Sequence, residues 1–490
     1  MNQDTRFFGH PAGLSTLFFT ELWERFGYYG MRALLVLFMT AGVAQGGFGY
    51  DSTRAFAIYG LYTASVYMAS LPGGWIADRI LGQQRTVLYG GVLIAIGYLT
   101  LALPAEATFF TGMAVVVVGT GLLKPNISTI VGQLYRPEDP RRESGFSIFY
   151  IGINLGSTIA PLACGWVGEK MNWHWGFALA GIGMVFGVIT YWFGLKRLGE
   201  AGLRPVEPPS AEVGRQWKKS FRNGLLGTAG VLMAGLALQG TGIVQFNAER
   251  LVDFAGLVLF GLTLALFGWM FFGGDWTAEE RKRLGVIAVL FVGSSLFWAA
   301  FEQAGSSFNL FAKNNTDTVL WGFDFPASWF QALNAGFIIS FAAVFAWIWI
   351  KLGDRQPGSV MKFALAMFCA TGGFAVMMMA AQRSAAGVKV SPMWLVVTYL
   401  LHTFGELLLS PVGLSAMTRL APSRVGGLMM GVWFLSLSMG NYLAGRLAAF
   451  YGDMQPYELF KSLGILTLVA ALALALIARP VARMMRGVEQ

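Results

Sequence analysis

The sequence is short of charge, cysteine and histidine. Asp, Glu, Lys and Arg make up 12% of its 490 residues, whereas a soluble globular chain carries roughly 25%. So few charges cannot cover a water-exposed surface, which excludes a soluble enzyme and a disordered chain. The two cysteines, Cys164 and Cys369, fall in apolar stretches, which indicates small core residues rather than a disulfide or a metal pair.

Apolar sequence is abundant instead. Hydrophobic residues make up 55% of the chain and its mean hydropathy is +0.57. Fourteen stretches approach or exceed the roughly 20 residues that a helix needs to cross a bilayer. They are 13–41, 53–78, 86–104, 107–133, 145–167, 174–195, 224–243, 251–273, 284–311, 327–351, 360–381, 392–417, 426–450 and 458–478. We therefore predict an all-α membrane protein with fourteen spans.

The order of these stretches predicts four parts. Residues 1–195 form an N-terminal six-helix bundle, 196–222 a Pro-rich, basic cytoplasmic linker, 223–275 an extra transmembrane helix pair, and 276–490 a C-terminal six-helix bundle. The two six-helix parts resemble each other weakly at an offset of 284 to 286 residues. Transporters built from such repeats place their substrate between them, near the bilayer midplane.

The net charge of +9 is explained by the placement of the basic residues. Of the 35 Lys and Arg, 24 fall in segments on the side of the N-terminus, eight on the opposite side and three inside spans. This bias is the positive-inside rule and predicts that both termini are cytoplasmic. Basicity here indicates topology and contact with anionic membrane lipids, and it argues against nucleic acid as a partner.

Seven charged residues lie inside the predicted spans, where each costs roughly 2.5–3.5 kcal/mol. They are Glu21, Glu24, Arg25, Arg32, Lys124, Glu302 and Glu406. One interpretation is an ion-pair network that only ties helices together. The other, which we favour because four spans contribute, is a polar cavity with acidic proton sites and basic anion sites. The set sums to −1, so one bound proton would neutralise it.

Aromatic and amide residues accompany these charges in the spans. A single aromatic there is usually a packing or interface residue, whereas a buried Asn needs hydrogen-bond partners. The candidates are Tyr28, Tyr29, Tyr67, Tyr150, Asn154, Trp298, Asn334 and Trp433. His402 lies one turn before Glu406, and we expect it to pack rather than react.

Several motifs carry a resemblance to a known family. ELWERFGYY (21–29) matches the ExxERFxYY motif of proton-dependent oligopeptide transporters of the major facilitator superfamily, and SIFYIGINLGS (147–157) is similar to their FYxxINxGS signature. GTGLLKPN, FWAAFEQ, PASWFQALN and GELLLSPVGL also resemble segments of that family, in the family's order. The extra helix pair is similar to that of bacterial members.

The segment GWIADRILGQQR (74–85) resembles the superfamily's loop motif through Gly74, Asp78, Arg79, Gly82 and Arg85. It is either an ordinary positive-inside loop or an ionic latch that stabilises one orientation of the carrier.

The resemblance implies a role for each matching position. Glu21, Glu24, Arg25 and Glu302 would couple protons, and Arg25, Arg32 and Lys124 would meet the peptide carboxylate. Asn154, Asn334 and Glu406 would hold the peptide amino terminus, and Tyr28, Tyr67, Trp298 and Trp433 would shape the side-chain pockets. Animal members carry a histidine after the tyrosine near position 59, where this chain has Tyr59-Gly60, so carboxylates would carry the proton.

The expected function is proton-coupled import of di- and tripeptides by alternating access, in a monomer of the bacterial inner membrane, with no cofactor other than the coupling proton. The alternative is a carrier of the same fold for another solute, such as nitrate or a drug-like anion. A membrane-embedded enzyme is disfavoured because no Ser/His/Asp order or HExxH motif occurs in the spans.

Overall fold

The computed structural model describes residues 4–136, 138–241, 248–422, 426–450 and 454–484, which are almost entirely helical. Fourteen helices of 19 residues or more and one short helix, α10, are described. The first six are α1 (Ala12–Thr40), α2 (Ser52–Ile76), α3 (Gln83–Leu101), α4 (Glu106–Gln133), α5 (Arg142–Lys170) and α6 (Trp173–Leu198). The others are α7 (Ala211–Gly240), α8 (Ala248–Phe272), α9 (Ala278–Phe301), α10 (Ser307–Asn315), α11 (Ala332–Leu352), α12 (Ser359–Ser384), α13 (Met393–Leu420), α14 (Gly426–Ala449) and α15 (Pro456–Met484).

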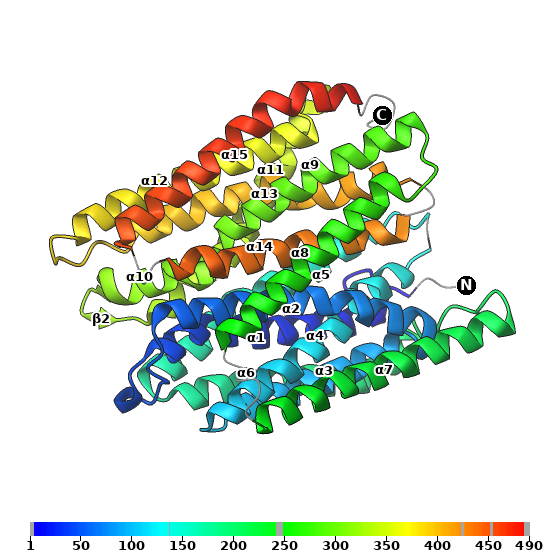
Figure 1. The fold of residues 1–490 in the computed structure, drawn as a ribbon, viewed down its shortest axis with the longest axis horizontal. Helices are drawn as coiled ribbons and strands as arrows, with labels where there is room; N and C mark the ends of the chain where they lie inside the picture. The colour runs from blue at the N-terminus through cyan, green and yellow to red at the C-terminus, as the bar shows by residue number, and fades with distance from the viewer. Residues whose placement is uncertain (1–3, 137, 242–247, 423–425, 451–453, 485–490) are drawn as a thin grey trace.

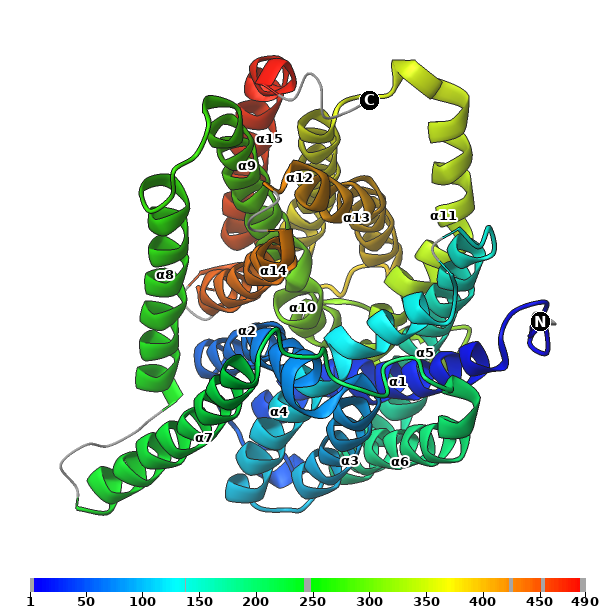
Figure 2. The same cartoon turned by 90° about the vertical axis from the view of Figure 1, so that its right-hand side faces the viewer.

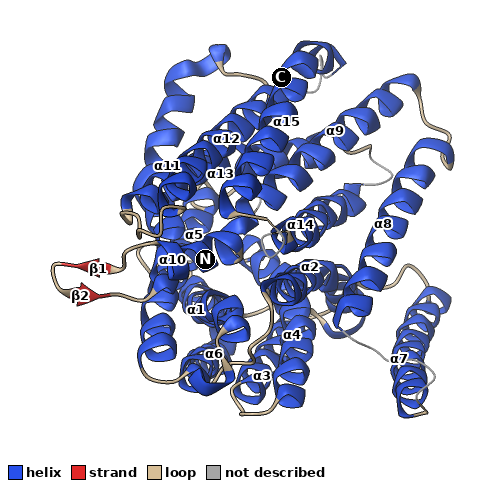
Figure 3. Ribbon diagram, turned by 60° about the vertical axis from the view of Figure 1, so that its left-hand side comes forward, coloured by secondary structure: helices blue, strands red, loops and turns tan. Residues whose placement is uncertain are grey.

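Short elements join or interrupt these helices. A π-turn, η2 (Ala77–Leu81), follows α2, and 3₁₀ turns lie at η1 (Val43–Gln45), η3 (Glu302–Gly305), η4 (Ala327–Gln331) and η5 (Gly353–Arg355). Strands β1 (Val319–Leu320) and β2 (Phe323–Asp324) pair antiparallel in a hairpin that projects from the helices (Figure 3). The predicted span 284–311 is therefore one membrane crossing made of α9, η3 and α10, broken at Glu302.

The helices form two bundles. Helices α1–α6 lie together, and α9 and α11–α15 form the second group, with both chain ends on the same side of the molecule (Figures 1 and 2). Buried apolar side chains fall into two clusters that follow this division, one mainly from α1–α6 and one mainly from α8–α15. Each bundle thus has its own core, which allows the two to move relative to each other.

Helices α7 and α8 lie beside the bundles rather than inside them (Figure 2). Helix α8 packs on α14, where Asp253 pairs with Arg446 at 3.0 Å. Helix α7 begins at Ala211, with the Ser210 side chain as its N-cap. The predicted linker 196–222 therefore contains the end of α6 and the start of α7, and only 199–210 is non-helical.

The irregular part of this linker is fastened to the N-terminal bundle. The Gln84 side chain donates hydrogen bonds to the carbonyls of Gly199 and Ala201, and the Val206 amide donates to the Asp78 carbonyl at 2.7 Å. The connection therefore lies on the loop between α2 and α3.

Ten of the described helices are long and apolar enough to cross a membrane by length and composition. Helix α1 is not among them because four charged residues interrupt its apolar sequence. These four charged residues of α1 belong to the candidate site.

Candidate functional site

The first group of site residues lies on one face of α1. The Arg25 guanidinium pairs with Glu21, with its Nε 3.3 Å from Oε1, and it also contacts the Glu24 carboxylate. All three side chains are buried. Among the described residues, Arg25 Nη2, Glu21 Oε2 and Glu24 Oε1 have no hydrogen-bond partner. Buried charged atoms that are left unpaired are costly, so this cluster has unused capacity for a proton and for an anion.

The second group joins the two bundles. Arg32 Nη2 of α1 lies 2.7 Å from Glu302 Oε2 at the start of η3. The Tyr59 hydroxyl of α2 accepts a hydrogen bond from Arg32 Nε at 2.7 Å and donates one to Glu302 Oε2 at 3.0 Å. All three side chains are buried. This arrangement places Arg32 against a carboxylate of the opposite bundle.

Gly60, next to Tyr59, lies where α2 and α14 approach each other closely. A Cβ at Gly60 would lie 2.7 Å from the Cα of Gly445 on α14. A larger side chain at this position therefore does not fit between the bundles in this conformation.

Lys124 of α4 is the third basic group. Its Nζ lies 3.9 Å from the centre of the Tyr67 ring, which is a cation–π arrangement. No carboxylate of the described residues lies within 4.0 Å of it in an ion pair. Pro125 follows it inside the helix. Lys124 is half-buried and available to an anionic group.

The C-terminal bundle contributes a half-buried acidic group, Glu406, which is called the acidic end below. The Asn334 amide of α11 donates hydrogen bonds to Glu406 Oε2 at 2.8 Å and to the Thr403 hydroxyl at 3.1 Å, both on α13. Glu406 also interacts electrostatically with Arg32 and Glu302. The Asn154 amide instead donates to the Tyr150 carbonyl of its own helix, at 2.9 Å. The structure therefore joins Asn334 with Glu406 and leaves Asn154 outside that pair.

The predicted aromatic residues differ in burial: Tyr28, Trp298 and Trp433 are buried, Tyr29 and Tyr67 are half-buried, and Tyr150 is exposed. Tyr28 lies under the Arg25 guanidinium, 5.2 Å from ring centre to Cζ, and Trp298 packs edge-to-face on Phe301 at 5.2 Å. Among the described residues the Trp298 indole N–H has no acceptor. Trp433 packs on Gly413 of α13.

His402 lies among aromatic rings, 5.2 Å from Phe374 and 5.4 Å from Phe308. His402 therefore packs among aromatic side chains, as we expected from the sequence.

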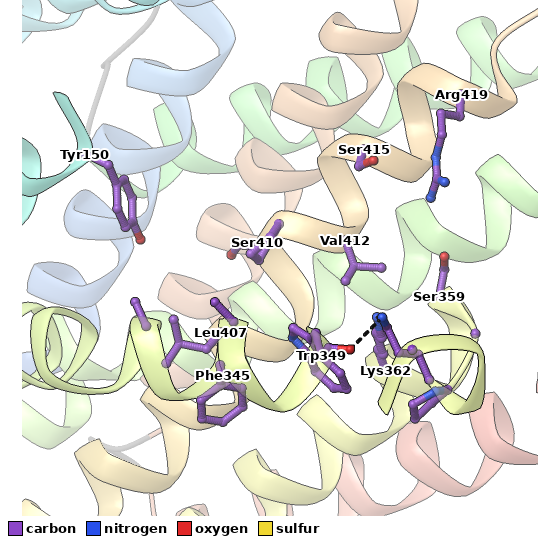
Figure 4. Close-up of a pocket in the computed structure, with 17 residues that line it drawn as sticks. Tyr150, Phe345, Trp349, Ser359, Lys362, Leu407, Ser410, Val412, Ser415 and Arg419 are labelled. Carbon is purple, nitrogen blue, oxygen red and sulfur yellow. Dashed lines mark hydrogen bonds between the residues drawn. The ribbon is translucent and has the colours of Figure 1, made fainter. Parts of the chain in front are cut away.

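A cavity of about 970 Å³ opens beside the acidic end (Figure 4). It is lined by α11 and α13, by the start of α12, and by Tyr150 of α5. It extends from Leu407, next to Glu406, to Arg419 near the end of α13 that faces the chain termini. Its volume lies within the roughly 300–1,000 Å³ typical of small-molecule sites. None of the predicted substrate-binding residues lines it, so this cavity is distinct from the group of charged residues described above.

The described contacts of the loop motif lie within the N-terminal bundle, the linker and α7. The Asp78 carboxylate accepts a hydrogen bond from the Gln83 amide at 2.9 Å, and the Arg79 guanidinium lies 5.0 Å from the Trp217 ring of α7. Gly82 has a positive φ of 80° and lies against the linker at Leu203. Gly74 lies 3.9 Å from Pro125, measured from the Cβ it would carry, and Arg85 is exposed. Within the described part of the chain, Asp78, Arg79 and Arg85 form no ion pair with the other bundle. The ionic latch stays a prediction.

The sequence did not single out Tyr59 and Thr403 as site residues. Both are common in apolar helices, where a Tyr or Thr usually packs or bonds to its own backbone. Only their proximity to Glu302 and Asn334, which lie far away in the chain, distinguishes them.

Two helical bundles around buried, oppositely charged groups define a membrane carrier. A family model described as the POT family matches residues 84–459. The chain belongs to this family, and the predicted family and major facilitator fold are confirmed.

Related proteins match along their full length. A peptide transporter of Yersinia enterocolitica, YePEPT, is 43% identical, with 99% of this chain and 97% of that protein covered. A di-/tripeptide transporter of Lactococcus lactis is 36% identical, with 99% and 98% covered. A crystal structure of a POT peptide transporter in complex with sulfate superposes with a TM-score of 0.93 at 42% identity, with 99% of this chain and 98% of that chain covered.

Proposed function

We propose that the protein is a proton-coupled symporter that imports di- and tripeptides by alternating access. The observation that carries this proposal is the separation of charge across the site. Basic Arg25 and Lys124 belong to the N-terminal bundle, and acidic Glu406, held by Asn334, belongs to the C-terminal bundle. A peptide is zwitterionic, with a carboxylate at one end and an ammonium at the other, and so it matches both groups at once.

The ion pairs suggest how a proton is used. Protonation of Glu21 or Glu24 weakens its pairing with Arg25, and the guanidinium then binds the peptide carboxylate. Protonation of Glu302 releases Arg32 in the same way and breaks a contact between the bundles. Inward movement of one charge gains roughly 2.3 kcal/mol per 100 mV of membrane potential. In this cycle protons are the coupling ion, and no cofactor takes part.

The acidic end also argues against the alternative solutes. Nitrate or a drug-like anion needs the basic groups only, and the Asn334–Glu406 pair would repel it. The names of the Yersinia and Lactococcus relatives support peptide as the substrate. A POT family structure in complex with 5-aminolevulinic acid, which matches at 36% identity and a TM-score of 0.90, shows that a relative accepts a small molecule with an amino and a carboxyl group.

We further propose that the chain acts as a monomer in the bacterial inner membrane with both termini in the cytoplasm. The distribution of Lys and Arg supports this orientation. The side that carries the termini is called the inner side below, and the opposite side the outer side. With this orientation the cavity between α11 and α13 opens inward, and the bundles meet on the outer side.

Uptake into proteoliposomes tests the proposal. Labelled dialanine should accumulate when an inward proton gradient is imposed, and a protonophore or excess unlabelled tripeptide should abolish the accumulation. Excess nitrate should have no effect. Folded protein that shows no gradient-stimulated uptake would contradict the assignment.

A further inference from the structure

Glu169, in the last turn of α5, has a carboxylate that contacts the opposite bundle. The side chain is 1% exposed. It accepts hydrogen bonds from the backbone amides of Ala327 at 3.3 Å and Ser328 at 2.9 Å, and from Lys313 Nζ at 3.1 Å. Helix α5 belongs to the N-terminal bundle, whereas Lys313 of α10 and the two amides of η4 belong to the C-terminal bundle. One buried carboxylate thus connects the two bundles on the outer side.

The partners of Glu169 are two backbone N–H groups at the start of a helix and a lysine ammonium, and all three stabilise an ionised carboxylate. The amides of Ala327 and Ser328 are the first N–H groups of the helical segment Ala327–Leu352. The first N–H groups of a helix have no partner within it and carry partial positive charge. Hydrogen bonds to an ionised carboxylate are roughly twice as strong as neutral ones. Glu169 therefore caps, from the other bundle, the helix that carries Asn334.

The backbones also approach closely below this contact. The Trp329 indole donates a hydrogen bond to the Leu162 carbonyl of α5 at 3.0 Å. A Cβ at Gly165 would overlap the Ser328 hydroxyl. The backbone of η4 therefore packs directly against α5 at Gly165. Asn154 lies further along α5, and Asn334 lies in α11, which continues from η4. The contact therefore covers the outer side of the site.

A second ion pair lies beside this contact but is exposed. Lys170 Nζ lies 2.6 Å from Asp324 Oδ2 of β2, with side chains 27% and 58% exposed. The hydrogen bond from Lys170 lowers the pKa of Asp324. Exposed ion pairs contribute little to stability because water and salt screen them. This neighbour is a matched control for Glu169, since it joins the same two bundles at the surface.

We propose that Glu169 is a positioning residue that keeps the outer side closed by holding the backbone of η4 against α5. This contact between α5 and η4 is called the outer gate. Release of Glu169 from the amides of Ala327 and Ser328 is the step that lets α11 move away from α5 and opens the site outward. The proposal rests on the alternating-access cycle proposed above. It adds a gate contact that is independent of the Arg32–Glu302 pair and of the substrate.

The test measures the conformation directly, without substrate. Spin labels are placed at Met171 and Val388, which are 72% and 67% exposed and lie in outer loops of the two bundles. The parent protein carries Cys164→Ala and Cys369→Ser. Pulsed electron paramagnetic resonance then gives the populations of short and long distances. Because no peptide is needed, failure of this test is distinguishable from failure of the peptide assignment.

Glu169→Ala should raise the ratio of long to short distances at least tenfold over the parent, because the amides and Lys313 lose their acceptor. Glu169→Gln should shift the ratio in the same direction by less, because its amide carbonyl still accepts a hydrogen bond. If the alanine variant does not fold, the glutamine variant provides the test. Lys170→Ala should match the parent. A Glu169→Gln distribution identical to the parent, or an equal shift in Lys170→Ala, would overturn the proposal.

Discussion

Arg32 and Glu302, 270 residues apart in the chain, form a 2.7 Å ion pair that the Tyr59 hydroxyl bridges from a third helix. The pair joins α1 to the break between α9 and α10. Breaking a buried ion pair by removing one partner typically costs about 3–5 kcal/mol. In the proposed cycle this pair is present in the outer-closed form and must break each time the outer side opens.

Glu302→Gln should stall transport because it leaves the Arg32 guanidinium buried against a neutral amide that cannot be protonated in the cycle. We expect gradient-driven uptake of dialanine to fall at least tenfold. Initial rates in proteoliposomes measure this, with Glu458→Gln, an ion-pair partner of Lys461 with a half-exposed side chain, as the control. Unchanged uptake in Glu302→Gln would mean that the pair is only structural.

Glu24→Gln separates coupling from substrate movement. The amide cannot take up a proton, but it can still accept a hydrogen bond from Arg25. Gradient-driven uptake should therefore be lost, whereas exchange of labelled for unlabelled peptide across the membrane should persist. Both assays use the same vesicles, so a folding defect would appear in each. Equal loss of exchange in well-folded protein would show that Glu24 is not a dedicated coupling residue.

Glu406→Gln should weaken binding of peptides that have a free amino terminus. The variant keeps the hydrogen bond with Asn334 but removes the negative charge, so dialanine should compete at least tenfold less well, a loss of about 1.4 kcal/mol. N-acetyl-dialanine, which has no ammonium, should compete equally with both proteins. Inhibition of labelled-peptide exchange measures the difference. Equal weakening for the two ligands would place the ammonium elsewhere.

Gly60→Ala tests the close contact between α2 and α14. The added methyl group would lie 2.7 Å from the Gly445 Cα, and overpacking of this kind costs about 1–3 kcal/mol. We expect a lower Tm in detergent. Gly227→Ala in α7 is the control, since nothing lies within 4 Å of its Cβ position and alanine favours a helix by roughly 0.5–1 kcal/mol over glycine. A Tm for Gly60→Ala equal to that of the unmodified protein would contradict the tight contact.

The sequence predicted the helices well because apolar length is a local signal, and the charged residues inside them could be located for the same reason. Apolar length identifies a span, and a carboxylate such as Glu24 is conspicuous within one. Tyr59 was not conspicuous, because its role depends on Glu302 in the other bundle. Glu169 was missed for a related reason: beside Lys170 at the end of a span it resembles an ordinary loop charge. Contacts between bundles are set by packing that no single segment encodes.

The start of α7 shows a different limit of prediction from the sequence. Pro-rich, basic sequence predicts a linker, and the segment 199–210 is irregular. The following residues, from Ala211, are basic as well as helical, and Trp217 lies on Arg79 of the loop motif. A basic amphipathic helix and a solvated linker have similar compositions, so the boundary between them required the structure.

Peptide-driven acidification tests the central claim most directly. A pH-sensitive dye is enclosed in proteoliposomes that have no proton gradient, and dialanine is added outside while an inside-negative potential is imposed. We predict that the interior acidifies with the unmodified protein and does not with Glu24→Gln, although that variant still exchanges peptide. Peptide entry without acidification in the unmodified protein would contradict proton coupling through the buried carboxylates.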